Sequence, residues 1–215
     1  MEQRGPSELT SCYDLETGEI IWSHATPARY QNKLGGIGPR STPTIYRGNV
    51  YSLGVTGTLN CLDGATGKVL WKKNLPKEVG ISAPEDAELV YYGRSNSPLI
   101  VDDLVVIPAG GTKEQGLHST QISYSSPSLV EICGTRQILS VNEQTVSGHD
   151  PDTGKTMWSH SWPGDNLSNS NSSQAVVIET DKVLLSKGYG NGAMLLQISR
   201  SDGDVWSVEK IWKKH

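Results

Sequence analysis

The residues of this sequence that could take part in catalysis or metal binding lie at the ends of apolar runs. Asp102-Asp103 and the stretch 202–204 supply oxygen atoms of the kind that Ca²⁺ prefers, and His149 stands beside Asp150, an arrangement that can move protons. These groups also fall at predicted hairpin turns, where acidic side chains usually face water. We therefore expect neither a metal site nor acid–base catalysis there.

Other motifs that carry chemistry are missing from the sequence. It contains no G-x-S-x-G, H-E-x-x-H or P-loop pattern. The glycine-rich stretches 35–38 and 188–192 are not followed by the helix that a dinucleotide-binding loop requires. Cys12, Cys61 and Cys133 form no C-x-x-C pair, which disfavours a metal site, a c-type haem and a disulfide framework. The chemistry-bearing residues therefore favour a chain that is not an enzyme.

One pattern, Asp-x-x-Thr-Gly-x-x-x-Trp, occurs three times. In each copy, β-branched and apolar residues flank the centre, which is typical of two strands joined by a turn. Asp and Thr side chains can accept hydrogen bonds from the amides of the turn, and Gly provides the left-handed backbone that closes it. The repeated residues are thus predicted to build β-hairpins: Asp14, Thr17, Gly18 and Trp22; Asp63, Thr66, Gly67 and Trp71; Asp150, Thr153, Gly154 and Trp158.

A second recurring element precedes the hairpins, so that each repeat holds four short strands. It reads STPTIYRGNVYSLGV, NSPLIVDDLVVIPAG and SSPSLVEICGTRQILSV, each an apolar run, a turn and another apolar run. The spacing from Trp22 to Trp71 is close to the period of about 40 to 50 residues found in propeller blades. The spacing from Trp71 to Trp158 is nearly two periods, so one hairpin motif is missing between them.

We therefore predict an all-β fold, a β-propeller of four-stranded antiparallel blades with about four to five blades in whole or part and an incomplete ring. Residues 1–215 form one partial propeller. Residues 76–94 are predicted to be a loop, and the basic end of the chain is predicted to be an edge strand. The predicted parts are an outer hairpin at 1–24, a blade at 41–75, a degraded blade at 95–123, and blades at 124–162 and 172–215.

Composition excludes some classes of partner. A formal net charge of −4 gives no basic surface for nucleic acid. No run approaches the roughly 18 apolar residues that cross a bilayer, and the residues after Met1 do not form a signal peptide. An incomplete ring exposes strand edges, so we expect either a piece of a longer protein or a homo-oligomer that completes the ring.

The hairpin motif resembles that of the pyrroloquinoline quinone (PQQ)-like β-propeller repeat proteins over nearly the whole chain. The stretches EQRG, CYDLETGEIIW, GPRSTPT and TVSGHDPDTGK are most similar to uncharacterised exported repeat proteins of planctomycete-like bacteria. The resemblance implies that Trp22, Trp71 and Trp158 pack between adjacent blades. It also implies a periplasmic or secreted location.

The family includes enzymes and scaffolds, and the resemblance leaves three functions open. The first is a non-catalytic module that binds a protein or small-molecule ligand. The second is a fragment of a PQQ-dependent alcohol or sugar dehydrogenase with PQQ and Ca²⁺, although the vicinal cysteines that cover the quinone in that family are absent here. The third is a scaffold of the outer-membrane assembly type, which would bind extended peptides by strand addition.

Polar residues stand where each innermost strand begins, at the expected mouth of the central channel. They could contact a ligand, or their hydroxyls could satisfy backbone groups where the strands crowd together. The ligand-binding candidates are Arg40, Thr42, Asn96, Ser97, Tyr124 and Ser126, within the sets 40–42, 95–97, 124–126 and 172–174.

Overall fold

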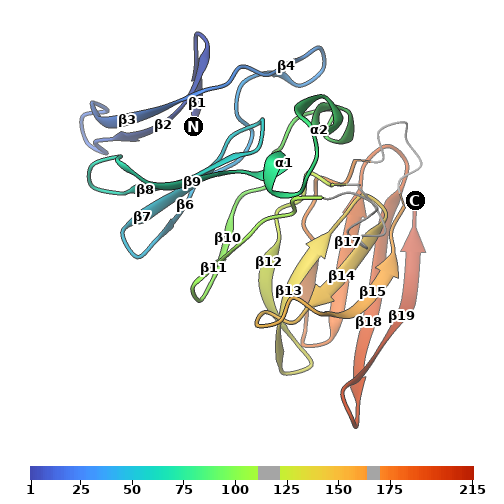
Figure 1. Ribbon diagram of the computed structural model, residues 1–215. Helices are drawn as coiled ribbons and strands as arrows, with labels where there is room; N and C mark the ends of the chain where they lie inside the picture. The colour runs from blue at the N-terminus through green and yellow to red at the C-terminus, as the bar shows by residue number, and fades with distance from the viewer. Residues whose placement is uncertain (111–121, 164–169) are drawn as a thin grey trace. The chain divides into compact units, whose positions relative to one another are not determined.

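Alternation of apolar and polar residues along short runs produces an almost entirely β structure. The computed structural model describes residues 1–110, 122–163 and 170–215, and the chain divides into two units, Met1–Ile122 and Ser123–His215. All strand pairs in both units are antiparallel among the described residues (Figure 1). The predicted all-β class of four-stranded antiparallel sheets is confirmed.

The first unit contains two sheets that carry the hairpin motif. One has three strands in the order β1 (Glu2–Arg4), β2 (Ser7–Tyr13) and β3 (Ile20–Pro27). The other has four strands in chain order, β6 (Thr44–Tyr46), β7 (Asn49–Leu53), β8 (Thr58–Asp63) and β9 (Val69–Asn74). The short pair β4 (Gln31–Asn32) and β5 (Gly36–Ile37) lies between them in sequence.

The middle repeat is reduced in the described residues. β10 (Leu99–Val101) and β11 (Leu104–Val106) form a two-stranded sheet, with Asp102 and Asp103 in the turn that joins them. Residues 111–121, at the end of the predicted degraded blade, lie outside the described residues.

The second unit consists of two complete four-stranded sheets in chain order. The first contains β12 (Ser128–Ile132), β13 (Thr135–Val141), β14 (Thr145–His149) and β15 (Thr156–Ser161). The second contains β16 (Val176–Ile178), β17 (Lys182–Lys187), β18 (Gly192–Ser201) and β19 (Val205–Lys214). Residues from both sheets, including Ile132, Val146, Trp158, Leu185 and Leu196, share one apolar core.

The three motif turns have the same hydrogen bonds. Oδ1 of Asp14, Asp63 and Asp150 accepts the amide of the Thr three residues later, at 2.8 Å in each turn. The following Gly has a φ of 69 to 72° in all three turns and donates its amide to the carbonyl of the same Asp. The turns therefore close through contacts that are local in sequence, as the motif predicts.

The hairpins also share one register. Cys12 lies opposite Trp22, Cys61 opposite Trp71, and Gly148 opposite Trp158, and each hairpin has a register shift next to this pair. Cys12, Cys61 and Cys133 are free thiols. Burial raises the pKa of the Cys61 and Cys133 thiols, which keeps them protonated.

The prediction that residues 76–94 form a loop is wrong, because two short helices lie within 75–89. α1 spans Leu75–Glu78 and α2 spans Ala83–Leu89. Ser82 and Glu85 form a capping box at the start of α2, and Asn74 caps α1 by accepting the amide of Lys77. These caps satisfy the first amides of helices that are too short to show a 3.6-residue pattern.

Candidate functional site

Arg40 stabilises a loop of its own unit. Its guanidinium donates to the backbone carbonyls of Gly38, Gly35 and Gly36 at 2.7, 2.9 and 3.1 Å. It also lies over the ring of Tyr30, 5.5 Å from the centroid. These contacts hold the β4–β5 turn in place and use much of the donor capacity that a ligand would need.

The other candidates of the first unit join the beginnings of β6 and β10. The amide of Thr42 donates to Oγ of Ser97 at 3.0 Å, and the hydroxyl of Thr44 donates to the carbonyl of Pro98. Ser41 donates its hydroxyl to the carbonyl of Leu53 in its own sheet. Asn96, beside Ser97, is buried and has interactions within the protein.

The equivalent residues of the second unit join the beginnings of β12 and β16. The amide of Tyr124 donates to the carbonyl of Asn171 at 2.9 Å, and Gln174 donates its side-chain amide to the carbonyl of Ser126 at 3.0 Å. The buried Asn171 side chain donates to the carbonyls of Asn142 and Glu143 at 2.6 and 3.0 Å. In each unit these polar groups link neighbouring repeats through backbone atoms.

The sequence reasoning did not find Asn171. The signal that could have found it is its place directly before the polar set 172–174, which precedes β16.

Polar contacts also join the sheet β1–β3 to the sheet β6–β9. The hydroxyl of Thr10 lies 3.0 Å from that of Ser52, and the side chain of Asn60 donates to Thr26 at 3.2 Å. The carboxylate of Glu8, which is 1% exposed, accepts the amide of Val55 at 3.2 Å. Burial raises the pKa of Glu8, although the Val55 amide and Arg40 oppose this.

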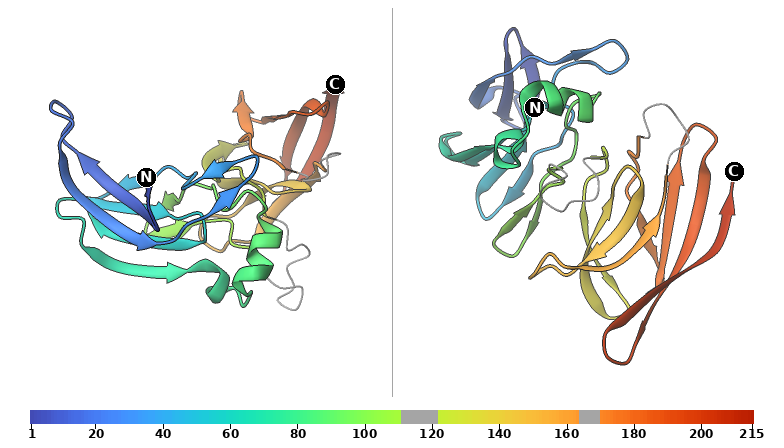
Figure 2. Two further views of the ribbon diagram at one scale, coloured as in Figure 1. Left: turned by 90° about the horizontal axis from the view of Figure 1, so that it is seen from above. Right: turned by 45° about the vertical axis from the view of Figure 1, so that its right-hand side comes forward.

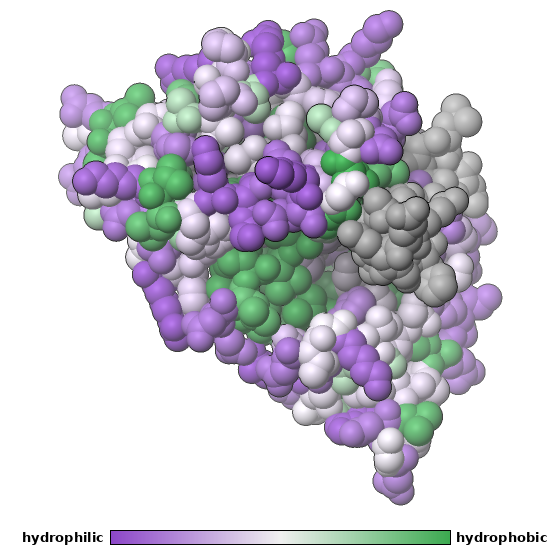
Figure 3. Space-filling view, viewed as in Figure 1, coloured by the Kyte–Doolittle hydropathy of each residue, from purple (hydrophilic) through white to green (hydrophobic). Residues whose placement is uncertain are grey.

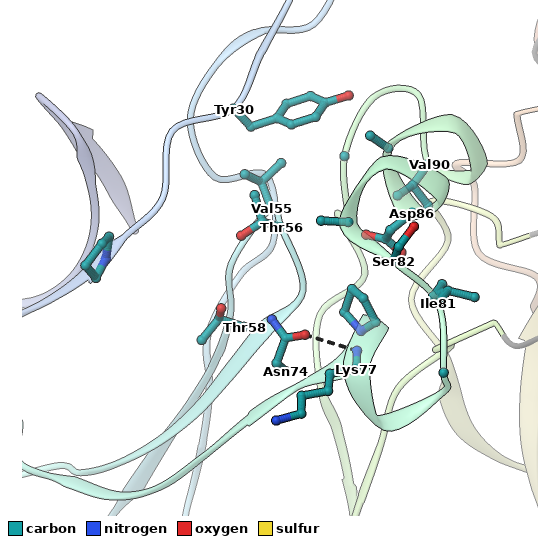
Figure 4. Close-up of a pocket in the computed structure, with 16 residues that line it drawn as sticks. Tyr30, Val55, Thr56, Thr58, Asn74, Lys77, Ile81, Ser82, Asp86 and Val90 are labelled. Atoms are coloured by element: carbon teal, nitrogen blue, oxygen red, sulfur yellow. Dashed lines mark hydrogen bonds between the residues drawn. The ribbon is translucent and has the colours of Figure 1, made fainter.

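The structure shows one feature that the sequence did not predict, a cavity of about 650 Å³ in the first unit (Figure 4). Its walls come from the β7–β8 turn, from α1 and α2, and from the segment that carries Tyr30. Val55, Ile81 and Val90 supply apolar surface, and Thr56 and Thr58 supply hydroxyls. The mixed lining is compatible with a small polar molecule but identifies none.

A buried ion pair supports the helical wall of this cavity. The side chain of Arg94 is 0% exposed and that of Asp86, on α2, is 7% exposed, and they are 2.5 Å apart. Arg94 also donates to the carbonyl of Ala109 at 3.1 Å, and its amide binds the carbonyl of Val55. Because both charges are paired, we assign the pair a structural role.

The donor groups do not fit the PQQ and Ca²⁺ site that the resemblance implies. Within 1–110, 122–163 and 170–215, no three His, Cys, Asp or Glu side chains gather in a way that could hold a metal ion. Asp102 and Asp103 are exposed in their turn, and His149 is hydrogen-bonded to Ser147 at 2.9 Å and to the carbonyl of Gly154 at 3.3 Å.

With the repeats and their turns established, comparison with known proteins identifies the family. The family model described as "Outer membrane protein assembly factor BamB" matches residues 7–213. The chain belongs to this family. A BamB from Yersinia pestis is 33% identical over 75 residues, which cover 33% of this chain and 19% of that protein.

The fold agrees with a solved member of this family. The structure of BamB from Moraxella catarrhalis matches 97% of this chain and 56% of its own, with a TM-score of 0.58 and 17% identity. The chain thus has the fold of a partial β-propeller and spans little more than half of that relative. A quinohemoprotein alcohol dehydrogenase from Comamonas testosteroni matches 71% of this chain and 18% of its own, with a TM-score of 0.37 and 19% identity.

No helix in the described part of the chain is long and apolar enough to cross a membrane.

Proposed function

We propose that this protein is a non-catalytic scaffold that binds other polypeptides, in a role of the outer-membrane assembly type. Membership of the family described by that name and the fold shared with BamB support the proposal. The hydrogen bonds of the Arg40, Thr42, Ser97, Tyr124 and Ser126 segments support it too, because these groups bind the protein's own backbone. A periplasmic or secreted location, and a relationship to exported repeat proteins, belong to the same proposal.

The observation that carries the proposal is the edge strand β19. It spans ten residues, pairs with β18 on one side, and stands last in its sheet among the described strands. A free strand edge binds extended chains through backbone hydrogen bonds. Ile211 on this strand is 47% exposed, and Lys210, Lys213 and Lys214 give it a positive charge. The partner that fits is an extended segment with alternating apolar and acidic residues.

Peptide binding tests this proposal directly. A fluorescein-labelled peptide from a strand of an outer-membrane barrel protein, with acidic and apolar residues in alternation, is titrated with the protein and followed by anisotropy. We expect saturable binding that weakens at least about tenfold when alternate peptide amides are N-methylated, because strand addition needs those donors. Equal binding of the methylated and unmethylated peptides would contradict it.

A variant of β19 locates the binding site. Ile211 falls at the register shift, where Trp212 pairs with Leu195 and Lys210 pairs with Leu196, so it has no partner in β18. Ile211→Pro should therefore weaken binding of the peptide with little effect on the β18–β19 pairing. The matched control is Val176→Thr on β16, an exposed position at the opposite edge of the same sheet. If the control weakens binding as much as Ile211→Pro, β19 is not the binding edge.

The alternative, a fragment of a PQQ-dependent dehydrogenase, is tested separately. The measurement is reduction of a redox dye with alcohols or sugars as substrates in the presence of PQQ and Ca²⁺. If the protein reduced the dye, the dehydrogenase alternative would replace the scaffold proposal.

A further inference from the structure

The joint between the first two sheets of this protein contains buried polar side chains. Where the sheet β1–β3 faces the sheet β6–β9, Thr10 contacts Ser52 and Asn60 donates to Thr26, and Glu8 lies on the same face. Figure 2 shows the two sheets side by side from two further directions, and Figure 3 shows apolar surface over their β2–β3 and β8–β9 hairpins. In the second unit, by contrast, two sheets share an apolar core. The first joint is therefore the more sensitive of the two to charge.

The carboxyl group of Glu8 fills the space beside a bare α-carbon of the next sheet. Glu8 is buried, and a Cβ on Gly54 would overlap its Oε2 atom. Both carboxyl oxygens lie 3.2 Å from the backbone nitrogen of Val55. Gly54 and Val55 belong to the β7–β8 turn, residues 54–57, so Glu8 contacts this turn from the β2 side.

The helical segment holds the other side of the same turn. The carbonyl of Val55 accepts the backbone amide of Arg94 at 2.9 Å, and the carbonyl of Gly57 accepts that of Leu75, the first residue of α1, also at 2.9 Å. The buried side chain of Val55 lies against Gly93, where a Cβ would overlap it. Since Arg94 is ion-paired with α2, the β7–β8 turn connects Glu8 to the helical wall of the cavity.

The charged and titratable groups around Glu8 come from the elements packed against it. Arg40 attracts the carboxylate, although its guanidinium also donates to the carbonyls of the β4–β5 turn. His24 of β3 lies on the same face, and burial together with Lys72 of β9 lowers its pKa. Gln3, the partner of Glu8 on β1, and the Gly-Val-Thr-Gly sequence of the β7–β8 turn are uncharged. Burial outweighs the Val55 amide and Arg40, so the pKa of Glu8 is raised.

We propose that Glu8 is a pH-dependent latch, which holds β2 against the β7–β8 turn when its carboxyl group is protonated and releases the turn when it is ionised. A buried carboxylate regains its hydration only if the turn moves away from β2, because the closed joint places it against Gly54. Through Val55 and Arg94, release of the turn loosens the helical wall of the cavity. The latch does not depend on peptide binding by β19.

Glu8 and His24 respond to pH with opposite signs. Because the closed joint raises the pKa of Glu8, the ratio of closed to open joint falls as the pH rises from the pKa of an exposed Glu, near 4, through the pKa in the closed joint. The closed joint lowers the pKa of His24, so charging this group opposes closure as the pH falls. Opening that increases with pH is therefore assigned to Glu8.

Native-state hydrogen exchange followed by NMR tests the latch through the amide of Val55. Protection factors are measured between about pH 4.5 and pH 8, with the intrinsic exchange rate at each pH divided out. The protection of Val55 and Arg94 should fall with rising pH, by about tenfold for each unit by which the closed joint raises the pKa of Glu8. The amide of Trp162, which donates to the carbonyl of Gln144 at 2.7 Å in the second unit, should keep its protection.

Two variants assign the effect to the carboxyl group. In Glu8→Gln, the protection of Val55 should no longer fall with rising pH, because the side chain stays uncharged. Glu16→Gln, at an exposed position in the turn between β2 and β3, is the matched control and should behave like the wild type. The wild type supplies a second readout that needs no variant. Its Val55 protection should level off at the pH where the ¹³C shift of the Glu8 carboxyl group titrates.

Three results would overturn the proposal. The first is protection of Val55 in the wild type that stays constant or rises with pH. The second is a decline that Glu8→Gln leaves intact. The third is an equal decline at Trp162, because the whole chain would then lose stability and the joint would not open by itself.

Discussion

The indole N–H of Trp22 donates a hydrogen bond to the backbone carbonyl of Gly64, and this bond ties β3 to the turn between β8 and β9. The ring also lies on Gly67 of that turn. One side chain therefore joins two sheets through a backbone acceptor and a bare α-carbon, and the turn must keep its glycine for two reasons, its positive φ and the ring above it.

Comparison of Gly67→Ala with Gly18→Ala separates the effect of the positive φ from the effect of the ring contact. The methyl group would come within 2.5 Å of the Trp22 ring, whereas the same change at Gly18 meets no described atom within 4 Å. Gly18→Ala should cost about 1–2 kcal/mol through its positive φ alone, and Gly67→Ala about 1–3 kcal/mol more through overpacking. Urea unfolding measures the free energy of unfolding of both variants. Equal losses of stability in the two variants would show that the ring contact contributes nothing.

Asp63→Asn should flatten the acid limb of the stability curve. Hydrogen bonds from the Thr66 hydroxyl and amide lower the pKa of Asp63 in the folded protein. A carboxyl with a lowered pKa stabilises the fold above its unfolded pKa, near 4, and loses this contribution as the pH falls through its folded pKa. Urea midpoints measured from neutral pH down to pH 3 should therefore fall less in Asp63→Asn than in the wild type. Glu88→Gln, at an exposed position on α2, is the control and should follow the wild type.

Glu8→Gln should have the opposite pH dependence. Burial raises the pKa of Glu8, so the unfolded chain loses this proton first, and the fold loses stability as the pH rises from the unfolded pKa through the folded one. The side-chain amide of Gln is uncharged, and its oxygen can still accept a hydrogen bond from the backbone amide of Val55. The variant should have a higher urea midpoint than the wild type at pH 7, with the difference shrinking below pH 4. A lower urea midpoint than the wild type at pH 7 would mean that the attraction of the Glu8 carboxylate to Arg40 outweighs the cost of burying its charge.

Removing one member of the Asp86–Arg94 pair should destabilise the first unit strongly. Asp86→Ala leaves a fully buried guanidinium without its counterion, which costs about 3–5 kcal/mol. The double variant Asp86→Leu with Arg94→Met removes both charges and should lose less than Asp86→Ala alone. Urea unfolding of the wild type and the two variants measures the difference, and a double variant less stable than Asp86→Ala would assign the loss to packing.

The hairpins could be predicted from sequence because their turns close locally. Asp14, Asp63 and Asp150 each accept the amide of a Thr three residues away, so one short motif contains all the information the turn needs. The helix α2 was missed although its capping residues, Ser82 and Glu85, stand in the sequence with the spacing of a capping box. A helix of seven residues has too few turns for its periodicity to be visible.

The partners of the polar strand ends could not be predicted. The amide of Thr42 binds Ser97, 55 residues away, and Gln174 binds the carbonyl of Ser126, 48 residues away. Such pairs are decided by how repeats pack, and residue type alone leaves ligand binding and backbone satisfaction equally open. The cavity beside α2 was missed for the same reason, because its walls come from segments between Pro27 and Gly93.

The locally closed turn has a consequence for how the chain acquires its structure. Every bond that closes a motif turn joins residues within five positions of one another, so a hairpin has its closing contacts as soon as its own residues are available. Loop closure over so few residues takes well under a microsecond, far faster than synthesis delivers the next segment. The closing contacts of the hairpins can therefore form one after another as the chain is synthesised, before the repeats pack on one another.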